Sequence, residues 1–219
     1  MIEVTQIRKS YGKKKVLSDI TFQVKPGECV AIAGKNGCGK STLMQIMAGI
    51  LKPDGGELCY FGKKATYRSS TFRRFCGYVP QENPLMEELT VQENLKLWGG
   101  SHNASTKELV AQFQLEDLLQ TEVSRLSGGM KRRLSIACAL VENPPFLLMD
   151  EPTTALDLYY KESIHQWMKT YQQKNGMILM TTHDESEIRN ADRCLFMDEG
   201  RVQELDAETI LQKFSGMSG

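Results

Sequence analysis

One short run of residues constrains the fold of this chain more than any other feature: Gly34-Lys-Asn-Gly-Cys-Gly-Lys40-Ser41-Thr42. A nearly continuous apolar stretch, Cys29–Ala33, precedes it, and apolar residues at three- and four-residue steps follow it (Leu43, Ile46, Met47, Ile50). The first pattern is typical of a strand buried on both faces, and the second of an amphipathic helix. Strand, glycine-rich loop and helix form one half of a βαβ unit, so the sequence predicts an α/β fold.

The spacing of this loop, G-x-x-x-x-G-K-[ST], also predicts what it binds. Glycines leave backbone N–H groups free to surround phosphate oxygens, and the N-terminus of the following helix adds positive potential. We expect Lys40 to reach the terminal phosphates of a nucleotide and the Ser41 hydroxyl to bind Mg²⁺. An ordinary glycine-rich turn is the alternative. The predicted nucleotide contacts in the loop are Gly34, Asn36, Gly37, Gly39, Lys40, Ser41 and Thr42.

Two carboxylates, Asp150 and Glu151, end a second apolar run, Phe146–Met149. Ligands of open α/β sheets bind at the carboxyl ends of the strands. We therefore expect Asp150 to be a partner of the Mg²⁺ ion and Glu151 to polarise an attacking water as a general base. This pair favours hydrolysis over phosphoryl transfer to a hydroxyl substrate. The alternative is two acidic residues that merely end a strand before Pro152.

A third motif, Leu126-Ser127-Gly128-Gly129-Met130, opens a stretch of helical spacing over 131–141. A hydroxyl and unhindered N–H groups at a helix N-terminus can bind an anion, whereas a plain N-cap is the alternative for a lone serine. With this motif the chain resembles the ATP-binding cassette (ABC) ATPases over nearly its whole length. Leu126–Met130 is similar to their LSGGQ signature, Gly34–Thr42 to Walker A and Phe146–Asp150 to Walker B.

The resemblance also implies roles for single residues. Glu151 resembles the catalytic glutamate, Gln81 the Q-loop glutamine and His183 the switch histidine. Residues 155–157 resemble the D-loop, which would place Asp157 near the nucleotide, and Tyr11 resembles the aromatic residue that stacks on adenine.

We therefore expect catalysis to involve Lys40, Gln81, Glu151 and His183, and Mg²⁺ binding to involve Ser41, Gln81 and Asp150. Three of the single residues have structural alternatives. Tyr11 could be a surface aromatic, Gln81 a loop hydrogen-bonding residue and His183 a satisfied structural group.

The chain departs from the family pattern at two positions. Met130 stands where the signature usually has glutamine, and Cys138 replaces an arginine expected in the helix that follows. Methionine cannot donate an amide hydrogen bond. Because the anion contacts attributed to the motif come from Ser127 and the glycine backbone, we expect function to survive.

The resemblance, together with these patterns, implies a single ABC ATPase domain over residues 1–219. The predicted fold is α/β: a P-loop NTPase core with a mixed or parallel sheet, an N-terminal antiparallel β subdomain and an inserted α-helical subdomain. The β and RecA-like core covers 1–80 and 127–219, and strand signals fade over about 81–126, where Val91–Trp98 and Thr106–Gln114 have helical spacing. The predicted strands are Ile2–Arg8, Asp19–Lys25, Cys29–Ala33, Phe146–Asp150, Met177–Thr182, Cys194–Met197 and Val202–Leu205.

Composition narrows the choice of partners. Lysine plus arginine equals aspartate plus glutamate at 27 each, which removes the bulk positive field that non-specific nucleic-acid binding needs. We expect no nucleic-acid partner and interpret the basic runs Lys13–Lys15 and Lys131–Arg133 as solvated faces. The apolar runs are shorter than the ~18–20 residues that cross a bilayer, and Met1–Ser10 lacks the apolar core of a secretory signal. The six cysteines lack C-x-x-C spacing and are predicted to be reduced thiols in buried structural positions.

The resemblance implies a head-to-tail dimer, either a homodimer or a pair with a second cassette, in which Ser127–Gly129 of one subunit covers ATP on the loop of the other. The leading interpretation is a cytoplasmic ATPase subunit, peripheral on the inner face of the cell membrane, that powers a separate multi-span membrane subunit. The helical insert and the Gln81 region would receive a helix of that subunit. Candidate contacts, or alternatively core residues of the insert, are Leu85, Met86, Leu89, Leu97 and Trp98.

A short C-terminus and the run Met130-Lys-Arg-Arg look more like small exporter-type cassettes, whereas the cargo would be determined by the membrane subunit. Two other classes stay open. One is a soluble cassette ATPase with an assembly role, such as iron–sulfur cluster assembly. The other is a P-loop kinase that phosphorylates a small molecule, against which the signature motif and Glu151 argue.

Overall fold

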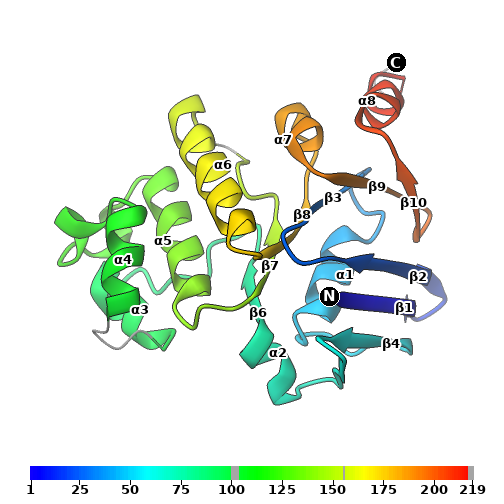
Figure 1. Ribbon diagram of the computed structural model, residues 1–219, viewed down its shortest axis with the longest axis horizontal. Coiled ribbons are helices and arrows are strands. Elements are labelled where there is room, and N and C mark those ends of the chain that lie inside the picture. Colours follow the sequence, from blue (N-terminus) through cyan, green and yellow to red (C-terminus); the bar gives the residue numbers. More distant parts are fainter. Residues whose placement is uncertain (100–103, 155, 217–219) are drawn as a thin grey trace.

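The structure is a computed structural model that describes residues 1–99, 104–154 and 156–216. Its centre is a six-stranded sheet in the order β10-β9-β3-β8-β7-β6, with helices packed against it (Figure 1). The strands run parallel except β10, which pairs antiparallel with β9. This arrangement confirms the predicted α/β fold with a mixed sheet. The strands are β3 (Cys29–Gly34), β6 (Cys76–Val79), β7 (Phe146–Asp150), β8 (Met177–Thr181), β9 (Arg193–Asp198) and β10 (Arg201–Leu205).

A separate antiparallel sheet, in the order β2-β1-β4-β5, contains the N-terminal strands. The predicted N-terminal antiparallel subdomain is thus confirmed, but β2 begins at Lys14 and not at Asp19. Asp19 has a φ of 57°, and the register between β1 and β2 shifts near it, so the apolar alternation breaks inside one continuous strand. The strands are β1 (Ile2–Tyr11), β2 (Lys14–Val24), β4 (Gly55–Tyr60) and β5 (Lys63–Lys64).

Both faces of the central sheet are covered, as the apolar character of β3 predicts. All six residues of β3 are buried. Cys29, Ala31 and Ala33 pack in one cluster with residues of α5 (Gly128–Leu140) and α6 (Leu158–Gln173). Val30 and Ile32 pack in a second cluster with residues of α1 (Lys40–Met47) and the antiparallel sheet. Because successive strand side chains point to opposite faces of the sheet, β3 lies between two hydrophobic cores, one on each face.

The segment between β6 and α5 contains the helices α3 (Val91–Leu97) and α4 (Ala104–Gln112), where the helical spacing predicts them. Thr90 and Glu93 form a capping box at the start of α3: the Thr90 hydroxyl accepts the Glu93 N–H, and the Glu93 carboxylate accepts the Thr90 N–H. The short helices α2 (Ser70–Phe75) and α7 (Glu185–Asn190) have no counterpart in the prediction, because six residues are too few to show a helical period. A further helix, α8 (Ala207–Ser215), follows β10.

None of the described helices combines the length and the apolar character that crossing a bilayer requires.

Candidate active site

A cleft of about 630 Å³ opens where the central strands end. Loops after β3, β6, β7 and β8 line it, together with residues of β1 and β2. Parallel strands carry their carboxyl ends at one edge of the sheet, so loops that are far apart in sequence meet there. Two lining residues, Val16 and Thr154, were not among the predicted site residues. The described residues of its lining are Tyr11, Val16, Asn36, Gly37, Gly39, Lys40, Ser41, Thr42, Gln81, Glu151, Thr154 and His183.

The glycine-rich loop is held in shape by its own lysine. Lys40, which is 7% exposed, donates from Nζ to the carbonyl oxygens of Gly34 at 2.7 Å and Lys35 at 3.1 Å. Gly39 has a φ of 114°, and a Cβ there would lie 2.9 Å from the Val16 carbonyl oxygen. Only glycine fits this position, immediately before α1 begins. The loop therefore presents backbone N–H groups and the helix N-terminus to the cleft, as a phosphate site requires.

Glu151 is the point where three loops meet. Its φ of 49° is unusual for a residue other than glycine and turns the chain directly after β7. The Glu151 carboxylate accepts from Gln81 Nε2 at 3.2 Å and from the Thr154 hydroxyl at 3.1 Å, and it lies 3.3 Å from Nδ1 of His183. The predicted residues Gln81 and His183 are thus both in direct contact with Glu151. Among the described residues that line the cleft, Glu151 is the only acidic one.

The predicted magnesium residues offer the right chemistry. Ser41 and Gln81 line the cleft, whereas Asp150 is 3% exposed and accepts a hydrogen bond from the Thr181 hydroxyl. Hydroxyl, amide and carboxylate oxygens are ligands that Mg²⁺ prefers, often with water and phosphate oxygens completing its shell. The donor set fits Mg²⁺, with Ser41 and Gln81 in the cleft lining and the buried Asp150 outside its described lining.

The interpretation of Lys131–Arg133 as a solvated face is wrong. Arg132 and Arg133 are 4% and 5% exposed. The Arg132 guanidinium donates to the carbonyl oxygens of Pro152 and Asp150, each at 2.9 Å, and to that of Pro80. It thereby ties the loops after β6 and β7 together, and burial lowers its pKa to about 10. Three consecutive basic residues carry no signal of burial, which depends on how α5 packs.

The signature motif lies outside the lining of the cleft. The Ser127 hydroxyl accepts the Met130 N–H at 3.3 Å and caps α5. Within its own chain, Ser127 therefore acts as a helix N-cap, the alternative interpretation of this serine, and does not line the cleft. Asp157 similarly caps α6 by accepting the Tyr160 N–H at 3.1 Å. Ala155, in the predicted D-loop, lies outside the described residues.

Tyr11 ends β1 at the rim of the cleft and is 51% exposed. Lys9 Nζ lies 5.7 Å from the centre of its ring. A half-exposed aromatic face at the rim can stack on a base.

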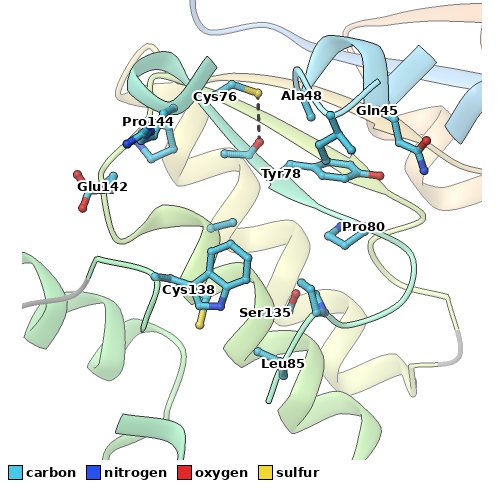
Figure 2. A pocket seen from close by; sticks show the side chains of 16 residues that line it. Gln45, Ala48, Cys76, Tyr78, Pro80, Leu85, Ser135, Cys138, Glu142 and Pro144 are labelled. Carbon is cyan, nitrogen blue, oxygen red and sulfur yellow. Dashed lines mark hydrogen bonds between the residues drawn. The ribbon is translucent and has the colours of Figure 1, made fainter. Parts of the chain in front are cut away.

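A second cavity of about 450 Å³, mainly apolar, lies beside α1, β6 and α5 (Figure 2). Of the five apolar residues that the sequence suggests for a partner, Leu85 and Trp98 line this groove. Met86 and Leu97 are exposed and Leu89 is half-buried, all outside its lining. Cys138, where the family pattern has an arginine, contributes a small uncharged wall. We call this cavity the apolar groove. Its other lining residues are Gln45, Ala48, Ile50, Arg73, Cys76, Gly77, Tyr78, Pro80, Pro84, Ser135, Ala139, Glu142 and Pro144.

The six cysteines are free, as predicted. Cys29, Cys138 and Cys194 are buried, as expected, whereas Cys38, Cys59 and Cys76 are only partly buried. Burial raises the pKa of the Cys138 thiol to about 12, so this wall of the apolar groove is uncharged at neutral pH.

Comparison with known proteins agrees with this geometry. Residues 17–154 match the family described as "ABC transporter". The chain is 37% identical over 209 residues to the Nod factor export ATP-binding protein I of Rhizobium etli, covering 91% of this chain and 66% of that protein. The same protein from Paraburkholderia xenovorans is 39% identical, with 91% of this chain and 68% of that protein covered. The chain thus spans about two thirds of the length of these relatives.

Among solved structures, the dimeric ATP-binding cassette MJ0796, in a post-hydrolysis state bound to ADP and phosphate, superposes with a TM-score of 0.86. It is 30% identical, and the match covers 94% of this chain and 99% of that chain. The shared fold therefore extends over the cleft and the apolar groove alike.

Proposed function

Since this chain belongs to the ABC transporter family, we propose that it is the nucleotide-binding subunit of an exporter, which hydrolyses ATP to ADP and phosphate. The observation that carries the proposal is the contact of Gln81, Glu151 and His183 beside the glycine-rich loop. A loop that binds phosphates, together with a carboxylate that can accept a proton from water, favours hydrolysis of ATP. The names of the relatives, which are export ATP-binding proteins, support the exporter assignment.

In this proposal each side chain has one task. Lys40 and the loop N–H groups hold the phosphates and offset their charge. Glu151 takes the proton of the attacking water, while Gln81 and His183 orient that carboxylate and face the terminal phosphate. Mg²⁺, when bound beside Ser41, Gln81 and Asp150, would supply further positive charge to the phosphate oxygens. Tyr11 stacks on the base.

In this proposal, the signature motif of one chain contacts the ATP that is bound to another cassette. Ser127–Gly129 lie outside the cleft of their own chain, yet Gly128 has open space at the position of a Cβ. We propose that this helix end, together with Asp157 at the start of α6, closes over ATP bound to another cassette. The dimeric state of MJ0796 supports a dimer of this kind. Binding of ATP at the seam would favour the closed dimer, and loss of the terminal phosphate would open it.

We further propose that the apolar groove receives a helix of a separate multi-span membrane subunit, which would hold the chain at the inner face of the membrane. The groove is concave, mainly apolar and open, features that suit the side chains of a partner helix. In this scheme residues 1–219 act as one ATPase domain, with 81–126 as a helical insert that carries Leu85 and Trp98 to the groove.

Phosphate release and dimer formation test the proposal. The purified protein with ATP and Mg²⁺ should release phosphate, and Glu151→Gln should slow this at least ~10²-fold while ATP binding remains. Light scattering should show a dimer of Glu151→Gln with ATP and a monomer without it. Near-normal turnover by Glu151→Gln would remove Glu151 from the role of general base. A monomer at saturating ATP would contradict the dimer mechanism.

A further inference from the structure

A buried carboxylate joins the two segments that carry Glu151 and His183. Glu187, in α7, is 2% exposed, and its carboxylate accepts hydrogen bonds from the hydroxyls of Thr153, at 2.8 Å, and Thr182. Thr153 lies two residues after Glu151, and Thr182 directly precedes His183. One side chain therefore connects the loop after β7 to the end of β8.

The hydrogen bonds around Glu187 also hold His183 from both sides. The Thr182 hydroxyl accepts the Asp184 N–H at 2.9 Å, and the Glu187 N–H donates to Asp184 Oδ1 at 3.3 Å. Through Glu187, the tripeptide Thr182-His183-Asp184 is closed into a hydrogen-bonded ring. The His183 side chain is 58% exposed, so its position beside Glu151 depends on this backbone and little on packing.

A buried carboxylate is unfavourable unless hydrogen bonds or a nearby cation compensate for lost hydration. Glu187 has both forms of compensation. Its charge favours the charged form of Arg132, which itself binds the carbonyl oxygens of Asp150 and Pro152. His165 Nε2, on α6, lies 3.7 Å from Glu187 Oε1. The loop after β7 is therefore held at Thr153 by Glu187 and at Pro152 by Arg132.

We propose that Glu187 is a positioning residue, which sets the separation of Glu151 and His183 by binding Thr153 and Thr182 at once. This inference rests on the proposed function and adds a residue to it. With both hydrogen bonds made, the loop after β7 and the end of β8 move as one unit. Without them the two catalytic side chains can separate, and a misplacement of ~1 Å can lower a rate ~10²-fold.

Steady-state kinetics test this role. The variants are Glu187→Ala, Glu187→Gln and Thr153→Val, and the control is Glu185→Gln, an exposed carboxylate on the same helix that pairs with Arg189. Glu187→Ala should lower kcat about 10²-fold with KM for ATP almost unchanged, because the glycine-rich loop is untouched. Glu187→Gln should recover part of the rate, since its amide oxygen can still accept one of the hydroxyls.

The control should keep the normal kcat. If Glu187→Ala does not fold, Thr153→Val decides, because it deletes one of the two hydrogen bonds and should lower kcat about tenfold. A double variant, Thr153→Val with Glu187→Gln, should lose less than the product of the two single losses, since both act on one contact. Normal kcat in folded Glu187→Ala or in Thr153→Val would overturn the proposal.

A second readout needs no hydrolysis. The imidazole NMR signals of His183, assigned with His183→Ala and recorded without nucleotide, should shift in Glu187→Gln and Thr153→Val but not in Glu185→Gln. Unchanged His183 signals in both variants would overturn the positioning role. Absence of phosphate release by the unmodified protein would instead overturn the proposed function, and the NMR comparison would still decide the role of Glu187.

Discussion

The nucleotide cleft and the apolar groove differ in how they are built, although their volumes, about 630 and 450 Å³, are comparable. The cleft consists mainly of loops at strand ends, which present N–H groups, hydroxyls and the Glu151 carboxylate. The groove is lined by residues of α1, β6 and α5 and by the segments that flank them, and most of the surface it presents is apolar. A polar cleft suits a charged small molecule, and an apolar groove suits a protein side chain. In the proposed function, the site of ATP hydrolysis and the surface that contacts the membrane subunit are thus two separate parts of one domain.

This comparison predicts that substitutions in the apolar groove weaken binding of the membrane subunit without changing the rate of ATP hydrolysis. Trp98→Ala should lower affinity for the membrane subunit about 30-fold, as loss of an aromatic anchor worth about 2 kcal/mol does. Co-purification and a binding titration with the membrane subunit measure it, and basal phosphate release should stay normal. Leu97→Ala is the matched control, because Leu97 is adjacent and 57% exposed but lies outside the groove lining. Equal losses in both variants would remove the groove from the contact.

The converse substitution, at Tyr11 on the rim of the cleft, should affect ATP binding. Tyr11→Ala should weaken ATP binding about tenfold, since an aromatic side chain stacked on a base contributes about 1–3 kcal/mol. Tyr11→Trp should bind ATP normally, because either ring offers a flat face. Calorimetric titration with ATP measures both. Tyr67→Ala, at an exposed tyrosine outside the cleft, is the control. Unchanged affinity in Tyr11→Ala would favour the surface-aromatic alternative for Tyr11.

The smallest expected effect concerns Asp184, which follows His183 and pairs with Lys161 at 2.6 Å. Burial of the Asp184 carboxyl opposes ionisation, but hydrogen bonds from Lys161 and Ser186 outweigh it and hold its pKa below the usual value. Its contribution to stability is therefore complete above the unfolded-state pKa of about 3.9 and is lost as the pH falls toward the folded-state value.

Asp184→Asn should accordingly lower the free energy of unfolding by up to about 1 kcal/mol between pH 5 and 7, with the difference from the unmodified protein shrinking below about pH 4. Urea unfolding across this pH range measures it. A difference that grows in acid would contradict the assigned direction of the pKa. ATP binding and partner binding should both be retained, because Asp184 lies in neither cavity lining.

The two cavities also differ in how far they can be predicted. The glycine-rich loop, Asp150 and Glu151 were identified from spacing, because their chemistry depends on local backbone shape such as the φ of 114° at Gly39. Gln81, Tyr11 and His183 came from family resemblance, and the structure places all three in the cleft lining. Thr154, which contacts Glu151, lies in the stretch between two recognised motifs and offered no separate signal.

The groove was only partly foreseen. Leu85 and Trp98 were suggested as exposed apolar residues, whereas other parts of its lining come from α1, β6 and α5, segments that are distant in sequence. The burial of Arg132 was not predicted for the same reason, since a basic run indicates solvent-exposed side chains unless the packing of its helix is known.

The sequence by itself determined the strand–loop–helix phosphate site, the paired carboxylates and the family, because glycine conformation and residue spacing act over a few bonds. Only the tertiary structure decided that Gln81, Glu151 and His183 touch, that Arg132 and Glu187 lie buried behind them, and where the apolar groove opens. These features arise from the packing of strands and helices that are far apart in the chain, and no local pattern encodes the distance between them.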